Sequence, residues 1–196
     1  HRLLNPRSIA IVGATERAGY ADRILTNLLR GGFQGRILPV SATRSTVRGI
    51  PAAASLSALE GPIDVAIVVV PAASVPDVVE ECGRTDVGAV VVISSGFDEA
   101  GEEGREYARR LREAGAAQLV IGPNGNGYAS VAAAAWATSY SDLNHDARPP
   151  MIPAALLSQS GGVAFGAGLG RALDHGYSFS VVVSTGNEEV TTSERL

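Results

Sequence analysis

Short apolar runs rich in β-branched residues recur along the first two thirds of the chain. They cover residues 8–13, 36–40, 63–71, 89–94 and 118–122. We expect helices between several of them, over residues 20–30, 75–82 and 104–114, with glycines ending the first two. Strands that are apolar throughout are buried on both faces, which is typical of a parallel sheet with helices on either side. The pattern predicts a doubly wound parallel α/β domain of the Rossmann-like class over residues 1–127.

The character of the sequence changes after this domain. Residues 128–153 hold an alanine run, then polar residues and paired prolines, and we expect a connection there. A further β-α-β unit follows, with strands over 154–158 and 178–183 and a helix over 162–175. One such unit cannot cover both faces of a sheet alone. It therefore either joins the first sheet or begins a second, truncated domain over 154–196, and we favour the second alternative.

Composition excludes several kinds of chemistry. All sixteen basic residues are arginine, so a Walker-A lysine, a lysine Schiff base and a Ser-Lys dyad are impossible within these residues. A net charge of −4 argues against a nucleic-acid partner. No apolar run approaches the ~20 residues that span a bilayer, and the first residues lack the apolar core of a signal peptide. We expect a cytoplasmic protein without a membrane partner.

Metal and disulfide chemistry are also not expected. Cys82 is the single cysteine, and His1, His145 and His175 have no spacing typical of metal ligands. We interpret Cys82 as buried and inert, His175 as a cation at a helix C-terminus, and Trp136 as a packing residue. The prediction is no metal site and no catalytic histidine in this chain.

The loops that follow strands carry the candidate site, because ligands of open parallel sheets bind at the carboxyl ends of strands. Residues 13–19 follow the first strand and open a helix, which suits a phosphate, although the spacing is not G-x-G-x-x-G. The alternative is a tight turn without a ligand. After the second strand the loop has no acid to hold ribose hydroxyls, but it has Arg44. Arg44 suits the phosphorylated ribose of NADP or coenzyme A; the alternative is a solvated surface arginine.

Further strand-end loops form a recurring signature. Val-Pro-Ala at 70–72, Ser-Gly-Phe at 95–97 and Gly-Pro-Asn at 122–124 each follow an expected strand, and each alone is ordinary turn chemistry. Together with other ordered motifs they make the chain similar to the NDP-forming acyl-CoA synthetases, relatives of the α subunit of succinyl-CoA synthetase. The other matching stretches are residues 5–14, 32–35, 37–40, 81–83, 93–97, 157–162 and 184–187.

The resemblance implies that the first domain binds coenzyme A (CoA) and that the unit over 154–196 is the start of a flavodoxin-like domain. Three groups of residues would contact CoA. The phosphates would lie at Gly13, Ala14, Thr15 and Arg17, the adenosine end at Val40, Ser41 and Arg44, and the pantetheine at Val70, Pro71, Ala72, Ser95, Gly96, Phe97, Asn124 and Gly125. Relatives usually have cysteine or serine at the position of Gly125, so a side-chain contact near the thiol is missing here.

The resemblance also implies a second loop and an activity. Ser158, Gln159, Ser160, Gly161 and Gly162 match the loop that receives a phosphohistidine, and the alternative is a helix start capped by Ser160. The expected reaction converts a small carboxylic acid, CoA and ATP or GTP to acyl-CoA, nucleoside diphosphate and phosphate through an acyl phosphate. The phosphohistidine, and the ATP-grasp domain or β subunit that holds the nucleotide with Mg, lie outside this chain. It should therefore be inactive alone and work within an oligomer.

Two other functions stay open. A non-catalytic module that senses CoA or acyl-CoA, as in multidomain lysine acetyltransferases, would use the same first domain. An NADP-dependent oxidoreductase is the third hypothesis, and it is weakened because no Tyr/Lys catalytic pair is possible without lysine. The abundance of alanine and arginine favours a bacterial source.

Overall fold

The computed structural model describes residues 1–144, 149–192, 194 and 196. Its larger sheet has five parallel strands in the order β2 (Arg36–Val40), β1 (Ser8–Val12), β5 (Ile63–Val68), β6 (Val87–Val92) and β7 (Val120–Ile121). Every residue of β1 and β5 is buried, including the polar Ser8 and Asp64 within these otherwise apolar runs. The predicted doubly wound parallel sheet is confirmed.

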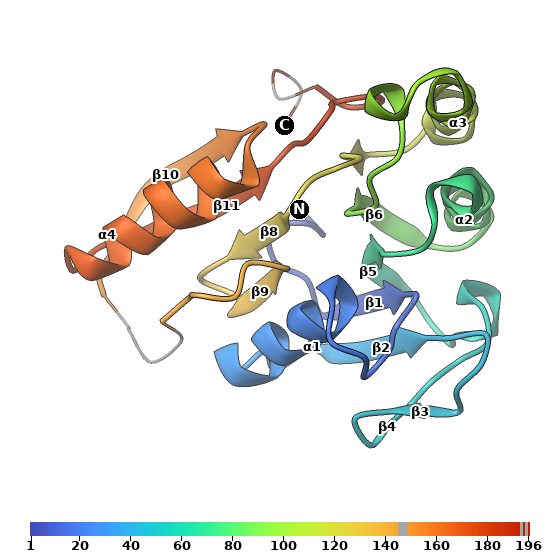
Figure 1. The fold of residues 1–196 in the computed structure, drawn as a ribbon. Coiled ribbons are helices and arrows are strands. Elements are labelled where there is room, and N and C mark those ends of the chain that lie inside the picture. The colour runs from blue at the N-terminus through green and yellow to red at the C-terminus, as the bar shows by residue number, and fades with distance from the viewer. Residues whose placement is uncertain (145–148, 193, 195) are drawn as a thin grey trace.

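Helices and a second sheet cover the two faces of this sheet (Figure 1). α2 (Val75–Arg84) and α3 (Glu102–Gly115) lie on one face, where a core cluster joins them to β5 and β6. α1 (Tyr20–Gly31) lies on the other and ends at Gly32, whose φ of 78° is left-handed. α2 was expected to stop at Gly83 but runs to Arg84, because Thr85 closes the last turn with hydrogen bonds to Glu81 and Cys82.

The strand ends differ from the sequence expectation by a few residues. β5 ends at Val68 rather than near residue 71, because the chain turns there toward a short 3-10 helix, η2 (Ala72–Ser74). The fifth run gives only a two-residue β7. An unpredicted hairpin of β3 (Thr46–Val47) and β4 (Ile50–Pro51) follows β2. Its turn residues Arg48 and Gly49 both have positive φ, which is typical of a tight two-residue hairpin.

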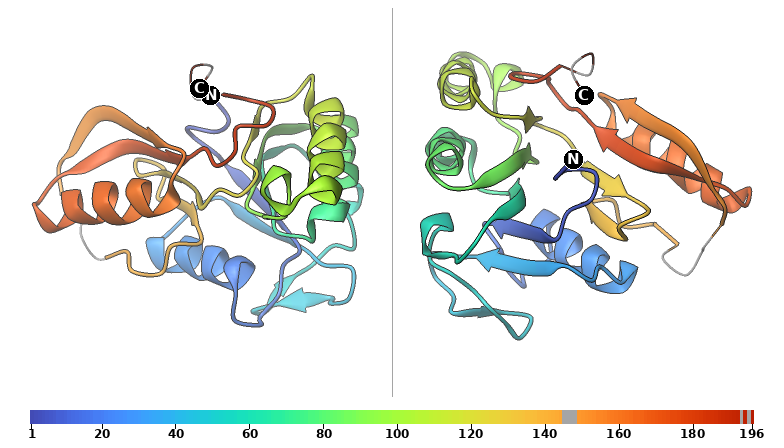
Figure 2. Two further views of the ribbon diagram at one scale, coloured as in Figure 1. Left: turned by 45° about the horizontal axis from the view of Figure 1, so that its top comes forward. Right: turned by 180° about the vertical axis from the view of Figure 1, so that it is seen from behind.

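The C-terminal unit forms a second sheet, shown from two sides in Figure 2. β10 (Met151–Ser158) and β11 (Ser178–Ser184) are parallel, as predicted. β11 also pairs antiparallel with β8 (Gly127–Ser130), and β8 pairs with β9 (Ala135–Thr138). β8 and β9 lie at or within residues 128–153, where we expected a connection without strands. Neither sequence alternative foresaw this pairing.

A continuous helical stretch covers one face of the second sheet. It begins as a π-helix, η4 (Gly162–Gly170), and continues as α4 (Arg171–Asp174). Its apolar residues, such as Phe165 and Leu169, pack on Trp136 and Val182. In the described part of the chain, no helix is long and apolar enough to cross a membrane.

The two sheets share one core. Tyr128, Ala135 and Ala137 of β8 and β9 belong to the same buried cluster as Ile24 and Leu28 of α1. In addition, the Asn27 side-chain amide donates to the backbone oxygens of Thr138 (2.7 Å) and Tyr140 (2.9 Å). β8 and β9 thus cover α1.

The chain then returns to the larger sheet after β11. Backbone N–H groups of Asn187, Glu189 and Thr191 donate to the oxygens of Pro123, Gly122 and Val120, at 2.9, 3.2 and 3.2 Å. We call residues 185–191 the return segment.

Candidate functional site

A hollow lies where the order of the larger sheet reverses. β2 and β5, the next two strands of this sheet along the chain, pair with β1 on opposite sides. The loops that leave β1 and β5 therefore diverge and open a crevice at the strand ends. The hollow has a volume of about 400 Å³. Its lining includes seven predicted site residues: Gly13, Ala14, Thr15, Val40, Ser41, Arg44 and Val70.

Gly13 is required by the backbone at this point. Its φ is 89°, and a Cβ there would lie 2.2 Å from the carbonyl oxygen of Val69. The N–H groups of Gly13 and Ala14 both donate to the Val40 carbonyl oxygen at 3.0 Å. These two amides are thus engaged within the protein. The glycine serves the close approach of β1 to the loop after β5. In the outer part of the loop, Thr15 lines the hollow and its hydroxyl oxygen accepts from the N–H of Arg17 at 3.2 Å, whereas the predicted phosphate residue Arg17 is not among the lining residues.

Arg44 lines the hollow, and other charged side chains lie next to it. Arg44 lies 3.9 Å from a carboxylate oxygen of Glu16, whose other oxygen accepts a hydrogen bond from the backbone of Arg48 (2.6 Å). The Arg48 guanidinium pairs with Asp22 at 2.6 Å. Arg44 is therefore a rim residue with a long, solvent-exposed ion pair. Such pairs contribute about 0–1 kcal/mol, so an incoming phosphate would displace Glu16 at little cost.

The loops after β5, β6 and β7 lie against one another. The Ser94 hydroxyl donates to the Val70 carbonyl oxygen (2.5 Å), and the Asn124 N–H donates to the Ser94 carbonyl oxygen (2.9 Å). The structure thus brings the three predicted pantetheine loops together. Phe97 is the exception, because the whole residue is fully buried and its side chain packs in the core.

The Ser158–Gly162 loop lies beside the Gly-Pro-Asn loop. A Cβ on Gly161 would lie 2.2 Å from the Asn126 side-chain nitrogen, and Thr185 N–H donates to the Ser158 oxygen at 2.9 Å. The Ser160 hydroxyl oxygen accepts a long hydrogen bond from Val163 N–H at 3.4 Å, but the N-cap position of η4 is Gly161, which makes no side-chain cap hydrogen bond. The loop lies next to the strand ends of the larger sheet.

The glycine at position 125 is explained by packing between the two sheets, which the sequence did not indicate. A Cβ at this position would lie 2.8 Å from the carbonyl oxygen of Ser184 at the end of β11. The Asn126 N–H accordingly reaches the Ser184 hydroxyl at 3.0 Å. Glycine at 125 lets the two units approach.

The residues to which no ligand-binding role was assigned from the sequence are not part of the candidate site in the structure. His175 binds the Arg171 carbonyl oxygen through Nδ1 (2.8 Å) at the helix end, and Trp136 is buried in the second core. Burial, with a smaller contribution from Glu81, raises the pKa of the Cys82 thiol to about 12, so this thiol is inert. His145 lies outside the described residues. Among the residues that are described, no group of three could hold a metal ion.

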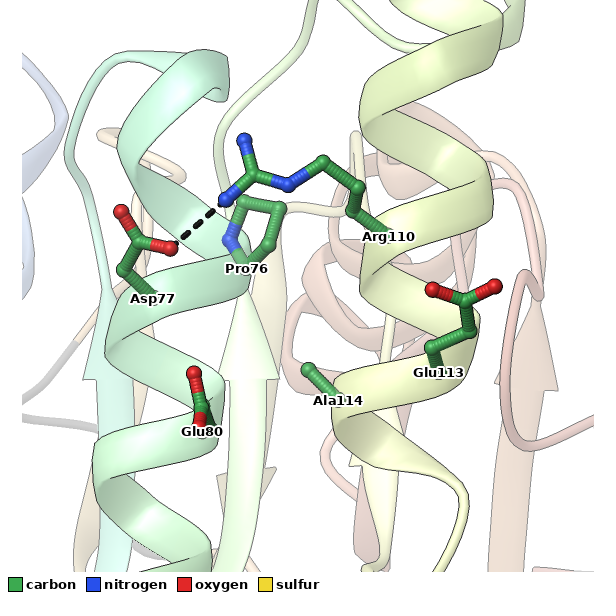
Figure 3. Close-up of a pocket in the computed structure, with 6 residues that line it drawn as sticks. All are labelled: Pro76, Asp77, Glu80, Arg110, Glu113 and Ala114. Carbon is green, nitrogen blue, oxygen red and sulfur yellow. Dashed lines mark hydrogen bonds and ion pairs between the residues drawn. The ribbon is translucent and has the colours of Figure 1, made fainter.

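A second hollow, of about 370 Å³, lies between α2 and α3 (Figure 3). Arg110 and Asp77 face one another across it in an ion pair of 2.7 Å, and Glu80 and Glu113 lie at its sides. Glu80 and Glu113 are themselves paired with Arg84 and Arg109 on their own helices. The charges of this groove are matched within the protein, and it lies on the helix surface rather than at a strand end.

A hollow at the switch point of a parallel sheet is typical of doubly wound domains that bind nucleotide-like ligands, and here Arg44 is part of its lining. The family model described as "CoA binding domain" matches residues 7–129 of this chain. The chain therefore belongs to the CoA binding domain family.

Longer proteins contain similar sequences. The chain is 38% identical over 198 residues to "Acetate--CoA ligase [ADP-forming] I subunit alpha" of Pyrococcus furiosus, covering 95% of this chain and 40% of the relative. It is also 38% identical to "Acetate--CoA ligase [ADP-forming] I" of Archaeoglobus fulgidus, covering 95% and 27%. The chain thus spans well under half the length of these relatives.

Solved structures of similar proteins have the same fold as this chain. The dinucleotide forming acetyl-coenzyme A synthetase 1 of Ca. Korarchaeum cryptofilum, in complex with phosphate and ADP, superposes with a TM-score of 0.85 at 32% identity. The match covers 98% of this chain and 40% of that chain. It includes both sheets, so the pairing of the C-terminal unit with β8 and β9 belongs to the shared fold.

Proposed function

We propose that this chain is the CoA-binding part of an NDP-forming acyl-CoA synthetase. The single observation that carries the proposal is the meeting of two loop systems at one place. The switch-point hollow and the loops after β5, β6 and β7 lie on the first unit, and the Ser158–Gly162 loop adjoins them from the second. A thiol carried along the first system would end near an anion held by the second.

In this proposal the nucleotide end of CoA lies at the hollow. Arg17 and Arg44 supply positive charge for its phosphates, while Val40 and Ser41 line the adenosine end. The pantetheine follows Val70–Ala72 and Ser95–Gly96 toward Asn124 and Gly125. The Arg44 guanidinium group at the edge of a mostly apolar crevice fits a phosphorylated ligand.

The chemical step needs groups from elsewhere. A phosphohistidine, and ATP or GTP with Mg on an ATP-grasp domain or β subunit, would be supplied by other segments or subunits. Ser158, Gln159, Ser160, Gly161 and Gly162 would receive the phosphohistidine at the first turn of η4, where small residues leave room for an anion. The reaction would form acyl-CoA from a small carboxylic acid through an acyl phosphate, in the cytoplasm and within an oligomer.

The proposed domain division follows from this. Residues 1–127 would bind CoA, 128–153 would connect, and 154–196 would be the N-terminal part of a flavodoxin-like domain. The ADP-forming ligases among the relatives support this assignment over an NADP-dependent oxidoreductase.

Calorimetric titration of the chain with CoA, acetyl-CoA, NAD and NADP tests the ligand. We expect saturable binding of CoA. Loss of one charge-assisted contact predicts that Arg44→Ala weakens binding about tenfold. Arg105→Ala, which removes an exposed arginine on α3, is the matched control and should bind as the unaltered chain does. Binding of NADP without CoA would overturn the proposal.

A further inference from the structure

Three strand-end loops meet at one side chain, Asn187 of the return segment. Its side-chain nitrogen donates to Glu99 Oε2 at 2.8 Å, and its side-chain oxygen accepts from Asn124 Nδ2 at 3.3 Å. Its backbone N–H donates to the Pro123 carbonyl oxygen at 2.9 Å. Asn187 therefore joins the loops after β6 and β7, on the first unit, to the loop after β11, on the second.

Glu99 is the other half of this junction. Its Oε1 accepts a hydrogen bond from the N–H of Gly96 at 2.7 Å, while Oε2 accepts from Asn187. Gly96 has a φ of 104°, so its loop adopts a conformation that few other residues allow. The carboxylate holds this loop from one side and the return segment from the other.

The electrostatic setting keeps Glu99 ionised. Desolvation alone would raise its pKa, but hydrogen bonds from the backbone of Gly96 and from Asn187 lower the pKa of Glu99 below its usual value. A carboxylate has two oxygens and no proton to donate, so it can accept from both neighbours at once. A neutral amide at this position could satisfy only one of them.

We propose that Glu99 is a positioning residue that couples the pantetheine loop to the C-terminal unit. By holding Gly96 and Asn187 together, it sets where the loop over 95–97 stands relative to the second unit. The inference rests on the proposed function, since that loop matters only if pantetheine passes along it. Its consequence is that ligand contacts beyond the nucleotide depend on a side chain that does not itself line the hollow.

The hydrogen-bond pattern offers a reciprocal test. Glu99→Gln leaves one oxygen for Gly96 but turns an NH2 group toward the NH2 of Asn187. Asn187→Asp alone sets two carboxylates against one another. The double variant Glu99→Gln/Asn187→Asp restores a donor and an acceptor, and the second oxygen at 187 still accepts from Asn124. Glu102→Gln removes a nearby exposed carboxylate at the start of α3 and is the matched control.

Binding would be measured by calorimetry with two probes, CoA and adenosine 3′,5′-bisphosphate, which lacks pantetheine. We expect Glu99→Gln to weaken CoA binding about fivefold, the scale of one exposed charge-assisted hydrogen bond. Binding of the bisphosphate should stay within about twofold, and the double variant should restore CoA binding to within about twofold of the unaltered chain. Glu102→Gln should leave both affinities unchanged.

Other results would overturn the inference. Equal weakening of both probes would mean a general loss of structure, and unchanged CoA binding in Glu99→Gln would mean that the junction has no influence. A double variant no better than the worse single variant would exclude the reciprocal pairing. If the unaltered chain binds the bisphosphate but not CoA, or neither, the proposed function itself fails, and the inference fails with it.

Discussion

Gly31 offers a direct test of how the two units pack. It is the last residue of α1, is buried, and has ordinary helical φ. Replacing glycine by alanine inside a helix normally stabilises a protein by up to about 1 kcal/mol. Here a Cβ would lie 2.0 Å from Cδ1 and 2.8 Å from Nε1 of Trp136, an indole only 3% exposed. The contact lies more than 1 Å inside van der Waals distance, so strain should outweigh propensity.

We expect Gly31→Ala to lower the free energy of unfolding by about 1–2 kcal/mol. This is the balance of an overpacking cost of up to ~3 kcal/mol and the helix gain. In a Trp136→Ala background, itself about 3–5 kcal/mol less stable, the same change should raise stability by about 0.5–1 kcal/mol because the clash is gone. The coupling between the two positions should therefore be about 1.5–3 kcal/mol.

Urea titrations with a shared m-value would measure these differences. Gly83→Ala in α2 is the matched control, since its Cβ would lie 3.1 Å from the side-chain nitrogen of Gln118, a contact much less close than the one at Gly31. The reasoning is refuted if Gly31→Ala stabilises the unaltered chain, or if it costs the same with and without the indole. Either result would mean that α1 and β9 do not pack as described.

Three further changes have defined outcomes. Gly13→Ala should cost about 3 kcal/mol or more in urea titrations, because it combines positive φ with a contact to Val69, and equal stability would refute this. Burial would raise the pKa of Asp64, but hydrogen bonds from the Arg7 backbone and Arg2 lower it below its unfolded value. Its contribution is then present above the unfolded pKa and lost as pH falls through the folded pKa. Asp64→Asn should therefore flatten the loss of stability between about pH 5 and pH 2, and parallel curves would contradict this. Tyr128→Phe should raise the free energy of unfolding by about 1 kcal/mol, since the buried hydroxyl has no hydrogen-bond partner among the described residues. A lower free energy of unfolding would contradict this.

The larger sheet was predictable because its strands have an unambiguous pattern. Residues 65–70, for example, are apolar throughout, and a run of this kind is typical of a strand that is buried on both faces of a sheet. β8 and β9 have no such pattern. Gly-Tyr-Ala-Ser and Ala-Trp-Ala-Thr are small residues around one aromatic ring, and they are strands because α1 and β11 offer them a buried edge. Tertiary packing decided these elements, and local propensity did not.

The site shows the same division between local and long-range causes. The strand-end loops were predictable because a parallel sheet always brings them to one edge. What each residue does there was not. Gly13 serves backbone packing against Val69, Phe97 faces the core, and Gly125 makes room for Ser184. Each role depends on a neighbour far away in sequence, so no local motif encodes it.

A boundary at residue 127 divides the sequence but not the core. Tyr128 and Ala137, beyond that boundary, lie in one buried cluster with Ile24, and Asn27 reaches two backbone oxygens past residue 137. The return segment then binds the edge of the larger sheet at β7. Removing the C-terminal unit would uncover α1 on one side and the strand-end loops on the other. Residues of both sheets therefore share one buried apolar cluster, and we expect the two sheets to unfold together.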